Sequence, residues 1–234
     1  MRTNLQQCVW VLTIAGSISC TTGFSADREI KINDRLDASA DSLTEMMSAP
    51  DKGPPHDLIE KARCVVVVPG MKKAGFIVGA EYGRGFAVCR RPGGLGWTAP
   101  AAMRVEGGSV GFQIGASDTD IVILVMNEGG MRHLLSDKFT IGGDATAAAG
   151  PVGRDLSART DVMMHAEMLS YSRSRGLFAG ISLEGATLRS DGQTNRELYS
   201  RDSTNREILS GDFKTPTVAA KFEDALNRDS AVRK

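Results

Sequence analysis

The chain has 234 residues, of which 41% are hydrophobic and 24% are charged, as is ordinary for a folded protein with one core. Its 28 Lys and Arg residues balance its 28 Asp and Glu residues, which excludes the general positive charge of a broad nucleic-acid binder, so any anion site must be local. The 26 glycines and the low aromatic content of 6% suit closely packed glycine-bearing strands better than platforms that stack bases.

Residues 1–26 have the pattern of a removable export signal. A positive charge near the start precedes an apolar run over residues 8–16, which is too short to cross a bilayer as a helix. Cleavage is expected after Ser25 or Ala26. The alternative is a lipoprotein signal that is cut before Cys20, which would then carry the lipid; we favour secretion without a lipid.

Export changes what the remaining cysteines are expected to do. Cys64 and Cys89 stay in the mature chain, in a compartment where disulfides persist. Cys64 opens the apolar run CVVVVP and Cys89 ends the strand FAVC, so a hairpin-like return predicts that they pair. Such a bridge would add on the order of 3 kcal/mol by chain entropy. Two separate buried thiols are the alternative, and no Cys or His spacing indicates a metal site.

The first predicted elements are two helices and a strand. Residues 30–48 place apolar side chains at helical spacing, and the polar side of this helix is acidic, which favours packing on the domain over insertion into a membrane. The stripe consists of Ile32, Leu36, Ala40, Leu43 and Met47. A short helix over HDLIEKAR leads into a strand at residues 64–68, which is expected to stop at Pro69-Gly70.

From Gly75 the apolar period changes to two. In GFIVGAEYGRGFAVC the apolar residues fall mainly on one face and the glycines on the other, and GGSVGFQIGA repeats this pattern. Glycine gathered on one face indicates a close approach or a sharp bend. We favour a curved sheet or a packed helix as the cause over a ligand surface. A central buried strand is expected over DIVILVMN, residues 120–127.

The second half of the chain predicts further short elements. A helix is expected through Met131 and Leu135, a strand from residue 139, and one strand over LFAGISLEGATL at residues 177–188. NRELYS and NREILS echo each other and predict helical turns that end at Gly211.

The C-terminal residues 212–234 predict a helical tail. Pro216 is its expected first-turn residue, and Val218, Phe222 and Leu226 form its apolar stripe.

Templates for catalysis are poorly matched. Gly107-Gly-Ser109-Val-Gly111 fits the GxSxG pattern of a nucleophile elbow, but that elbow needs a helix after the serine, and here a strand is expected to continue. His56, His133 and His165 are scattered, and no carboxylate pair is nominated for acid/base chemistry. We expect no enzyme, no cofactor and no metal, with a serine hydrolase that uses Ser109 as a minor alternative.

The glycine-rich segment FTIGGDATAAAGPVGRDL, residues 139–156, suggests a phosphate cradle at first sight. A Walker loop needs Lys followed by Ser or Thr after its final glycine, whereas Gly150 is followed by Pro-Val. Pro151 and Gly153 also break the dinucleotide pattern GxGxxG. No nucleotide partner is therefore expected.

Several segments together resemble the SYLF domain, also called the Ysc-type actin-binding domain. They are KKAGFIVGAEYGRGF, the tryptophan segment GWTAP, GGSVGFQIGASDTDIVILVMN, FTIGGDATAAAGPVGR and YSRSRGLFAGISLEGATL, in this order and spacing. The resemblance covers roughly residues 36–211 and rests on several motifs at once, so it is far more specific than a single glycine pattern.

The resemblance implies an α+β fold with a curved, mainly antiparallel, barrel-like sheet packed with several short helices, over one domain at residues 27–211. Eukaryotic members bind phosphoinositide-containing membranes, some bind actin filaments, and SH3 or FYVE modules often accompany them. Bacterial members are exported domains and frequently lipoproteins, which implies a periplasmic, membrane-anchored or secreted protein of a bacterial cell envelope. No SH3 or FYVE segment is found here, and the acidic N-terminal helix argues against carrying over phosphoinositide specificity.

A basic cluster is the candidate site that the sequence offers. Lys72 and Lys73 are expected in the turn before the glycine strand, Arg84 lies within that strand, and Arg90 and Arg91 follow it. If the strand bends back, these charges gather at one end and meet lipid phosphates, each adding about 1 kcal/mol near an anionic surface; a solvated hairpin rim is the alternative.

The predicted function is a non-enzymatic domain of the cell envelope that binds an anionic phospholipid or a phosphoinositide-like headgroup. The alternative is a protein-interaction or scaffold module whose small-residue faces bind a partner chain. No nucleic acid is expected as a partner.

Overall fold

The structure is a computed structural model that describes residues 32–49, 54, 56–75, 78–91, 93, 96–110, 115–152, 165–174, 176–211 and 213–229. These residues belong to the unit from Lys31 to Lys234. The predicted export signal, with Cys20, lies outside the described residues. None of the helices in the described ranges is long and apolar enough to cross a membrane.

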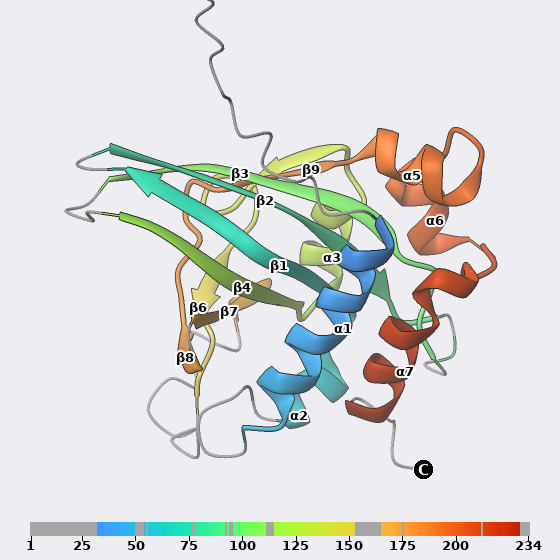
Figure 1. The fold of residues 1–234 in the computed structure, drawn as a ribbon, viewed down its shortest axis with the longest axis horizontal. Helices are drawn as coiled ribbons and strands as arrows, with labels where there is room; N and C mark the ends of the chain where they lie inside the picture. Colours follow the sequence, from blue (N-terminus) through green and yellow to red (C-terminus); the bar gives the residue numbers. More distant parts are fainter. Residues whose placement is uncertain are drawn as a thin grey trace, which may run out of the picture. The chain divides into compact units, whose positions relative to one another are not determined.

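One curled, mostly antiparallel sheet dominates the fold and confirms the predicted α+β class (Figure 1). The strand order is β5-β9-β3-β2-β1-β4-β7-β6, with β8 paired to β7, and β6 runs parallel to β7. The strands are β1 (Cys64–Gly75), β2 (Val78–Cys89), β3 (Ala101–Val110), β4 (Gly115–Val125), β5 (Lys138–Thr140), β6 (Ala147–Ala149), β7 (Met168–Ser174), β8 (Leu177–Gly180) and β9 (Thr187–Ser190).

Helices cover parts of both faces of the sheet (Figure 1). They are α1 (Ile32–Met47), α2 (His56–Lys61), α3 (Glu128–Leu134), α5 (Gly192–Tyr199), α6 (Asn205–Ser210), the short 3-10 helix η1 (Thr217–Ala219) and α7 (Ala220–Asp229). As predicted, α1 buries its apolar stripe, apart from the partly buried Ile32, and it packs on β1 and β2. Its acidic side is joined to neighbouring elements, because Asp41 pairs with Lys221 of α7 at 2.8 Å.

The central strands are buried on both faces, so their sequences are continuous apolar runs. In β4, Ile121 and Ile123 belong to a core with α3 and α6, whereas Val122 and Leu124 belong to a second core with α1 and α7. The predicted central strand over residues 120–127 is thus confirmed, apart from its last two residues.

The predicted end of the first strand at Pro69-Gly70 is wrong, because β1 continues to Gly75. The register of β1 shifts between Val68 and Met71, so Pro69 and Gly70 form a β-bulge. Gly70 has φ +56° in this bulge, and its N–H donates to Oδ1 of Asp120 at 2.9 Å. Proline has no backbone N–H to donate to a neighbouring strand, but a β-bulge tolerates this. The strand therefore bends at Pro69-Gly70 instead of ending there.

The glycine face of β2 packs on its own neighbouring strand. A side chain at Gly83 would overlap Val68, and a Cβ at Gly85 would overlap the carbonyl oxygen of Val67. The favoured explanation, a curved sheet, therefore accounts for these two glycines. In the glycine-rich segment at residues 139–156, a Cβ at Gly150 would likewise overlap the ring of Tyr171.

Two further boundaries differ from the prediction. The single strand expected over residues 177–188 is divided into β8 and β9, which pair with different strands, β7 and β3. The turn between them contains Gly185 at φ +85°. The second glycine repeat is likewise divided between β3 and β4, which are not neighbours in the sheet; residues 111–114 of it lie outside the described residues.

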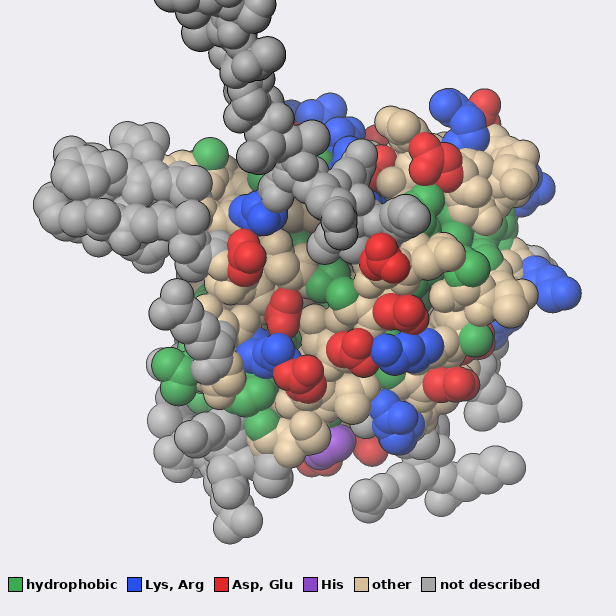
Figure 2. Space-filling model, in the orientation of Figure 1, with side chains coloured by type: hydrophobic (Ala, Val, Ile, Leu, Met, Phe, Trp, Pro, Cys, Tyr) green, Lys and Arg blue, Asp and Glu red, His purple; other side chains and the backbone are tan. Residues whose placement is uncertain are grey.

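The C-terminal helix is part of the core in the described structure. Phe222 and Leu226 of α7 are buried with α1 in the second core, whereas Val218 of the predicted stripe is 41% exposed. Figure 2 shows acidic and basic side chains intermixed over the outer surface of this helix layer.

Candidate functional site

The five predicted lipid-binding residues do not form one cluster. In the β1–β2 hairpin, Lys72 lies opposite Tyr82 and Lys73 opposite Glu81, whereas Cys64 lies opposite Cys89 at the other end of the hairpin. At about 3.3 Å per residue, the two lysines are roughly 30 Å along the strand from Arg90 and Arg91, which follow Cys89. The expected gathering at one end is wrong, because the strand that was predicted to stop continues and carries the lysines away.

Arg90 and Arg91 hold the loop after β2 in place. The guanidinium of Arg90 lies 4.1 Å from the centre of the Trp97 ring and donates to the carbonyls of Ile59 and Glu60 in α2. Nε of Arg91 donates to the carbonyl of Trp97 at 2.7 Å. Partial burial holds the pKa of Arg90 below its ordinary value, and the carboxylate of Glu60 offsets only part of this effect. These contacts give both arginines a structural role.

The two lysines also have carboxylate neighbours. Lys73 pairs with Glu81 at 2.9 Å, and Lys72 lies 3.8 Å from Asp118. The side chain of Lys72 is nevertheless 54% exposed and lies opposite Tyr82, which is 43% exposed.

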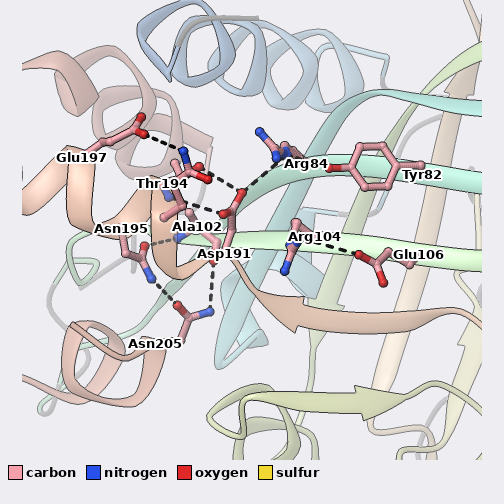
Figure 3. A network of polar contacts seen from close by, with 11 residues as sticks. Tyr82, Arg84, Ala102, Arg104, Glu106, Asp191, Thr194, Asn195, Glu197 and Asn205 are labelled. Atoms are coloured by element: carbon pink, nitrogen blue, oxygen red, sulfur yellow. Dashed lines mark hydrogen bonds and ion pairs between the residues drawn. The ribbon is translucent and has the colours of Figure 1, made fainter. Parts of the chain in front are cut away.

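Arg84 belongs to a different arrangement that the sequence analysis missed. It lies directly opposite Arg104 of β3, Arg104 lies opposite Arg189 of β9, and Arg189 lies opposite Lys138 of β5. Directly opposed residues point to the same face of a sheet, so these side chains form a line of positive charge across adjacent strands. We call this line the cation row; Figure 3 shows its Arg84 and Arg104 on β2 and β3.

Two carboxylates offset part of this charge. Glu106 lies 3.9 Å from Arg104 and 3.4 Å from Arg189, and Asp191 lies 3.6 Å from Arg84 (Figure 3). Like charges placed directly opposite each other destabilise a sheet, so the row has a cost that Glu106 and Asp191 only partly offset. Within the described residues, Nε of Arg104 is buried without a hydrogen-bond partner.

Much of the cation row faces solvent. The exposed fractions of the side chains are 44% for Arg189, 31% for Arg104 and 26% for Arg84, and Lys138 is exposed. The opposite sides of the same strands are buried, since Met103, Leu188 and Phe139 belong to the core. The row therefore lies on a solvent-facing part of strands whose other face is fixed by packing.

Asp191 connects the row to the C-terminal helices. Its carboxylate caps α5 by accepting from N and Oγ1 of Thr194. The carboxylate is buried, with 5% of the side chain exposed, so it is held in place beside Arg84.

A pair of buried asparagines fixes these helices on β3. Oδ1 of Asn195 accepts from N of Ala102, Nδ2 of Asn205 donates to O of Ala102, and Nδ2 of Asn195 donates to Oδ1 of Asn205 (Figure 3). The repeated NRE sequence thus supplies two asparagines that satisfy both backbone groups of one residue.

No sequence motif predicted the cation row. Arg84, Arg104, Lys138 and Arg189 are far apart in the chain, and only the strand register brings them together. The one local sign is that Arg104 and Arg189 alternate with buried apolar residues, which places them on the outer face.

The features of catalysis are not assembled in the described residues. Ser109 lies within β3, paired with Gly79, and the strand continues beyond it to Val110. The next described element is strand β4, which begins at Gly115, whereas a nucleophile elbow is followed directly by a helix. His133 lies 4.0 Å from Glu167, and no group of three His, Cys, Asp or Glu residues in the described ranges is arranged to hold a metal.

Comparison with known proteins gives a consistent family assignment. Residues 106–229 match the Ysc84 family, described as Las17-binding protein actin regulator. The chain is 40% identical over 182 residues to SH3 domain-containing YSC84-like protein 1 of Xenopus laevis, which covers 77% of this chain and 54% of that protein. The human protein of the same name is 37% identical over 188 residues, covering 79% of this chain and 54% of the relative.

A yeast relative extends the comparison. Protein YSC84 of Saccharomyces cerevisiae is 32% identical over 169 residues, which cover 71% of this chain and 36% of that protein. The chain spans about half the length of the vertebrate relatives that it matches. The family match covers more than half of this sequence, and the Xenopus laevis relative covers 77% of it. The chain therefore belongs to the Ysc84 family, whose characteristic domain is the SYLF domain.

Proposed function

We propose that this chain is a non-enzymatic protein-interaction module that binds its partner through the cation row. The observation that carries this proposal is the alignment of four cations on adjacent strands, on a face that remains open to solvent. Charged surfaces of this kind steer partners and select them by charge. The family description, which names a Las17-binding actin regulator, and the relatives with SH3 domains support a role in protein assembly.

Site-specific photocrosslinking in the cells that produce the chain tests the proposal. A photoreactive amino acid replaces Thr187, which lies beside Arg189 on β9, and in the matched control it replaces exposed Asn227 on α7. We expect a defined protein adduct from position 187 that is absent from position 227 and that purified components reproduce. The absence of a protein adduct at position 187, or the same adduct at both positions, would contradict the proposal.

Filamentous actin is the first purified partner to test, because the family description names actin regulation. If the partner is actin, the chain will sediment with filaments, and the double charge reversal Lys138→Glu and Arg189→Glu will keep it in the supernatant. If neither protein sediments, actin is excluded and the partner must be the one identified by crosslinking.

Binding to anionic lipid is a second candidate function. The observation in its favour is the exposed pair of Lys72 and Tyr82 on the β1–β2 hairpin, since lysine and tyrosine both suit a membrane–water boundary. Flotation with anionic vesicles at low salt should then be reduced by Lys72→Glu and unchanged by Lys221→Glu on α7. Failure of the unmodified protein to float would exclude this candidate.

We also propose that the chain is exported to the cell envelope, with Cys20 as the candidate lipidation site. The leader-like sequence of residues 1–26 supports export, and so does the Cys64–Cys89 disulfide, which joins the paired ends of β1 and β2. Cell fractionation tests the location. Palmitate labelling that Cys20→Ala abolishes would show lipidation, whereas unlabelled protein in a soluble envelope fraction would favour secretion without a lipid.

A further inference from the structure

The cation row runs across four neighbouring strands of the sheet. Its members lie at directly opposed positions on β2, β3, β9 and β5, and neighbouring strands are about 4.8 Å apart. Three strand spacings therefore give a row about 14 Å long, which ends at the edge strand β5. This length accommodates several negative side chains of one extended or helical segment.

The adjacent row of the sheet has a different character. Tyr82 lies opposite Glu106, Glu106 opposite Thr187, and Thr187 opposite Thr140. Tyr82, Thr187 and Thr140 offer hydroxyl groups beside the cation row, whereas Glu106 contributes a carboxylate; the hydroxyl oxygens of Thr140 and Thr187 lie 3.4 Å apart. A polypeptide lying across these strands thus meets both charge and neutral hydrogen-bonding groups.

The geometry is poorly suited to a single phosphate group. A phosphate is usually held by converging donors, often at a helix N-terminus. The nearby N-terminus of α5 is already capped by Asp191, whose carboxylate accepts from Thr194 and also lies beside Arg84. Glu106 stands between Arg104 and Arg189 and would repel a dianion centred there. Carboxylates spread along a chain can avoid Glu106 and contact the outer cations.

From these observations we propose that the cation row binds an acidic segment of a partner protein, with several Asp or Glu side chains lying across β2, β3, β9 and β5. This inference rests on the proposed function, because it specifies the chemistry of the partner at the same surface. The more exposed members, Arg189 and Lys138, make the principal contacts.

Fluorescence anisotropy with a labelled deca-glutamate peptide and the full chain tests the inference. We expect salt-sensitive binding, no binding of a deca-glutamine peptide, and a loss of about five- to tenfold in affinity in the double variant Lys138→Gln and Arg189→Gln. Lys221→Gln is the matched control, because Lys221 is a half-exposed, ion-paired cation on α7. It should bind the peptide like the unmodified chain.

Folding is monitored in the same variants. Neutralising two members of a row of like charges should leave the melting temperature unchanged or raise it. Reduced peptide binding then reflects the lost cations. If the double variant melts at a lower temperature, the single variant Lys138→Gln, at the exposed edge strand, replaces it and should lose about two- to fivefold in affinity.

Two results would overturn the inference. One is deca-glutamate binding that is absent or equal in the unmodified chain and the folded variant. The other is lipid binding by the cation row. In that case the variant would no longer float with anionic vesicles, whereas its affinity for the peptide would be unchanged. If crosslinking at position 187 still yields the partner in either case, the proposed function stands and only the acidic-segment inference fails.

Discussion

Gly85 lies where two strands of the sheet come into backbone contact. A Cβ at this position would overlap the carbonyl oxygen of Val67, and a carbonyl in the middle of a buried strand cannot move aside without breaking its pairing. The glycine is therefore required by the bend that the bulge of β1 introduces.

Replacing Gly85 with alanine should destabilise the protein by about 3 kcal/mol or more, because overlap with the backbone forces the strands apart. Gly108→Ala is the matched control, since a Cβ there would meet only the carbonyl oxygen of Gly79 at an ordinary 3.9 Å. That change should be neutral or slightly stabilising. Urea unfolding measures both, and equal effects would contradict the contact argument.

Asn195 shows how one buried side chain can hold a helix on a strand. Its Oδ1 accepts from N of Ala102 at 2.7 Å, and its Nδ2 donates to Asn205 at 2.6 Å. Asn195→Ala leaves a buried N–H without a partner and should cost about 1–3 kcal/mol. Asn227→Ala, at an exposed position of α7, should change the free energy of unfolding by less than about 0.5 kcal/mol. Chemical denaturation distinguishes the two; a neutral Asn195→Ala would show that the asparagine pair is dispensable.

At the scale of elements, α6 begins with a complete capping box. Thr204 accepts from N of Glu207, and Glu207 accepts from N of Thr204 at 2.8 Å. Hydrogen bonds from Thr204, first from its backbone and then from its side chain, lower the pKa of Glu207 below its ordinary value.

This cap makes a pH-dependent contribution to stability. Because the folded-state pKa of Glu207 is lowered, ionised Glu207 stabilises the fold fully above the pKa that it has in the unfolded chain, and the benefit is lost as the pH falls through the lower folded-state pKa. The melting temperature of the unmodified chain should therefore exceed that of Glu207→Gln near neutral pH, and the difference should shrink in acid. The difference should also be smaller in a Thr204→Ala background. A difference that is independent of pH would contradict this origin.

The boundaries of elements show where local sequence is a limited guide. Pro69 and Gly70 usually end a strand, but here Asp120 on the neighbouring strand accepts from N of Gly70 and stabilises a bulge. A local pattern cannot reveal this acceptor, because Asp120 is fifty residues away in the chain. The division of β8 from β9 has a similar cause, since each pairs with a different distant strand.

At the scale of the whole molecule, the two terminal helices of the described unit pack together. Lys221 of α7 pairs with Asp41 of α1 at 2.8 Å, and Phe222 is buried in the core that contains Leu36 and Leu43. The C-terminal helix thus helps to cover the sheet through its apolar side chains.

Phe222→Ala should consequently destabilise the whole unit by about 3–5 kcal/mol, because it removes a buried aromatic ring from the second core. Val218→Ala, at a position that is 41% exposed just before α7, should have an effect of less than about 0.5 kcal/mol. Thermal unfolding followed by near-UV circular dichroism tests this. Small and equal effects would show that α7 behaves as an independent tail.

Much of the fold could be predicted from local patterns. The stripe of α1, the buried run of β4, the helical turns before Gly211 and the pairing of Cys64 with Cys89 all follow from short segments whose periodicity or composition dominates. The candidate site could not, because the basic residues that are close together in the sequence lie at opposite ends of a long hairpin.

The sequence by itself determined the family, through several motifs in a fixed order and spacing, and with it the class of fold that the family resemblance implies. It also determined that no recognisable nucleotide motif is present, because such motifs need particular residue types at short spacing. Only the tertiary structure decided which charges act together. Strand register aligned Arg84, Arg104, Arg189 and Lys138 across more than a hundred residues of chain, and curvature at the bulge required Gly85. Both follow from pairing between distant strands, and that pairing is set by the burial of their opposite faces.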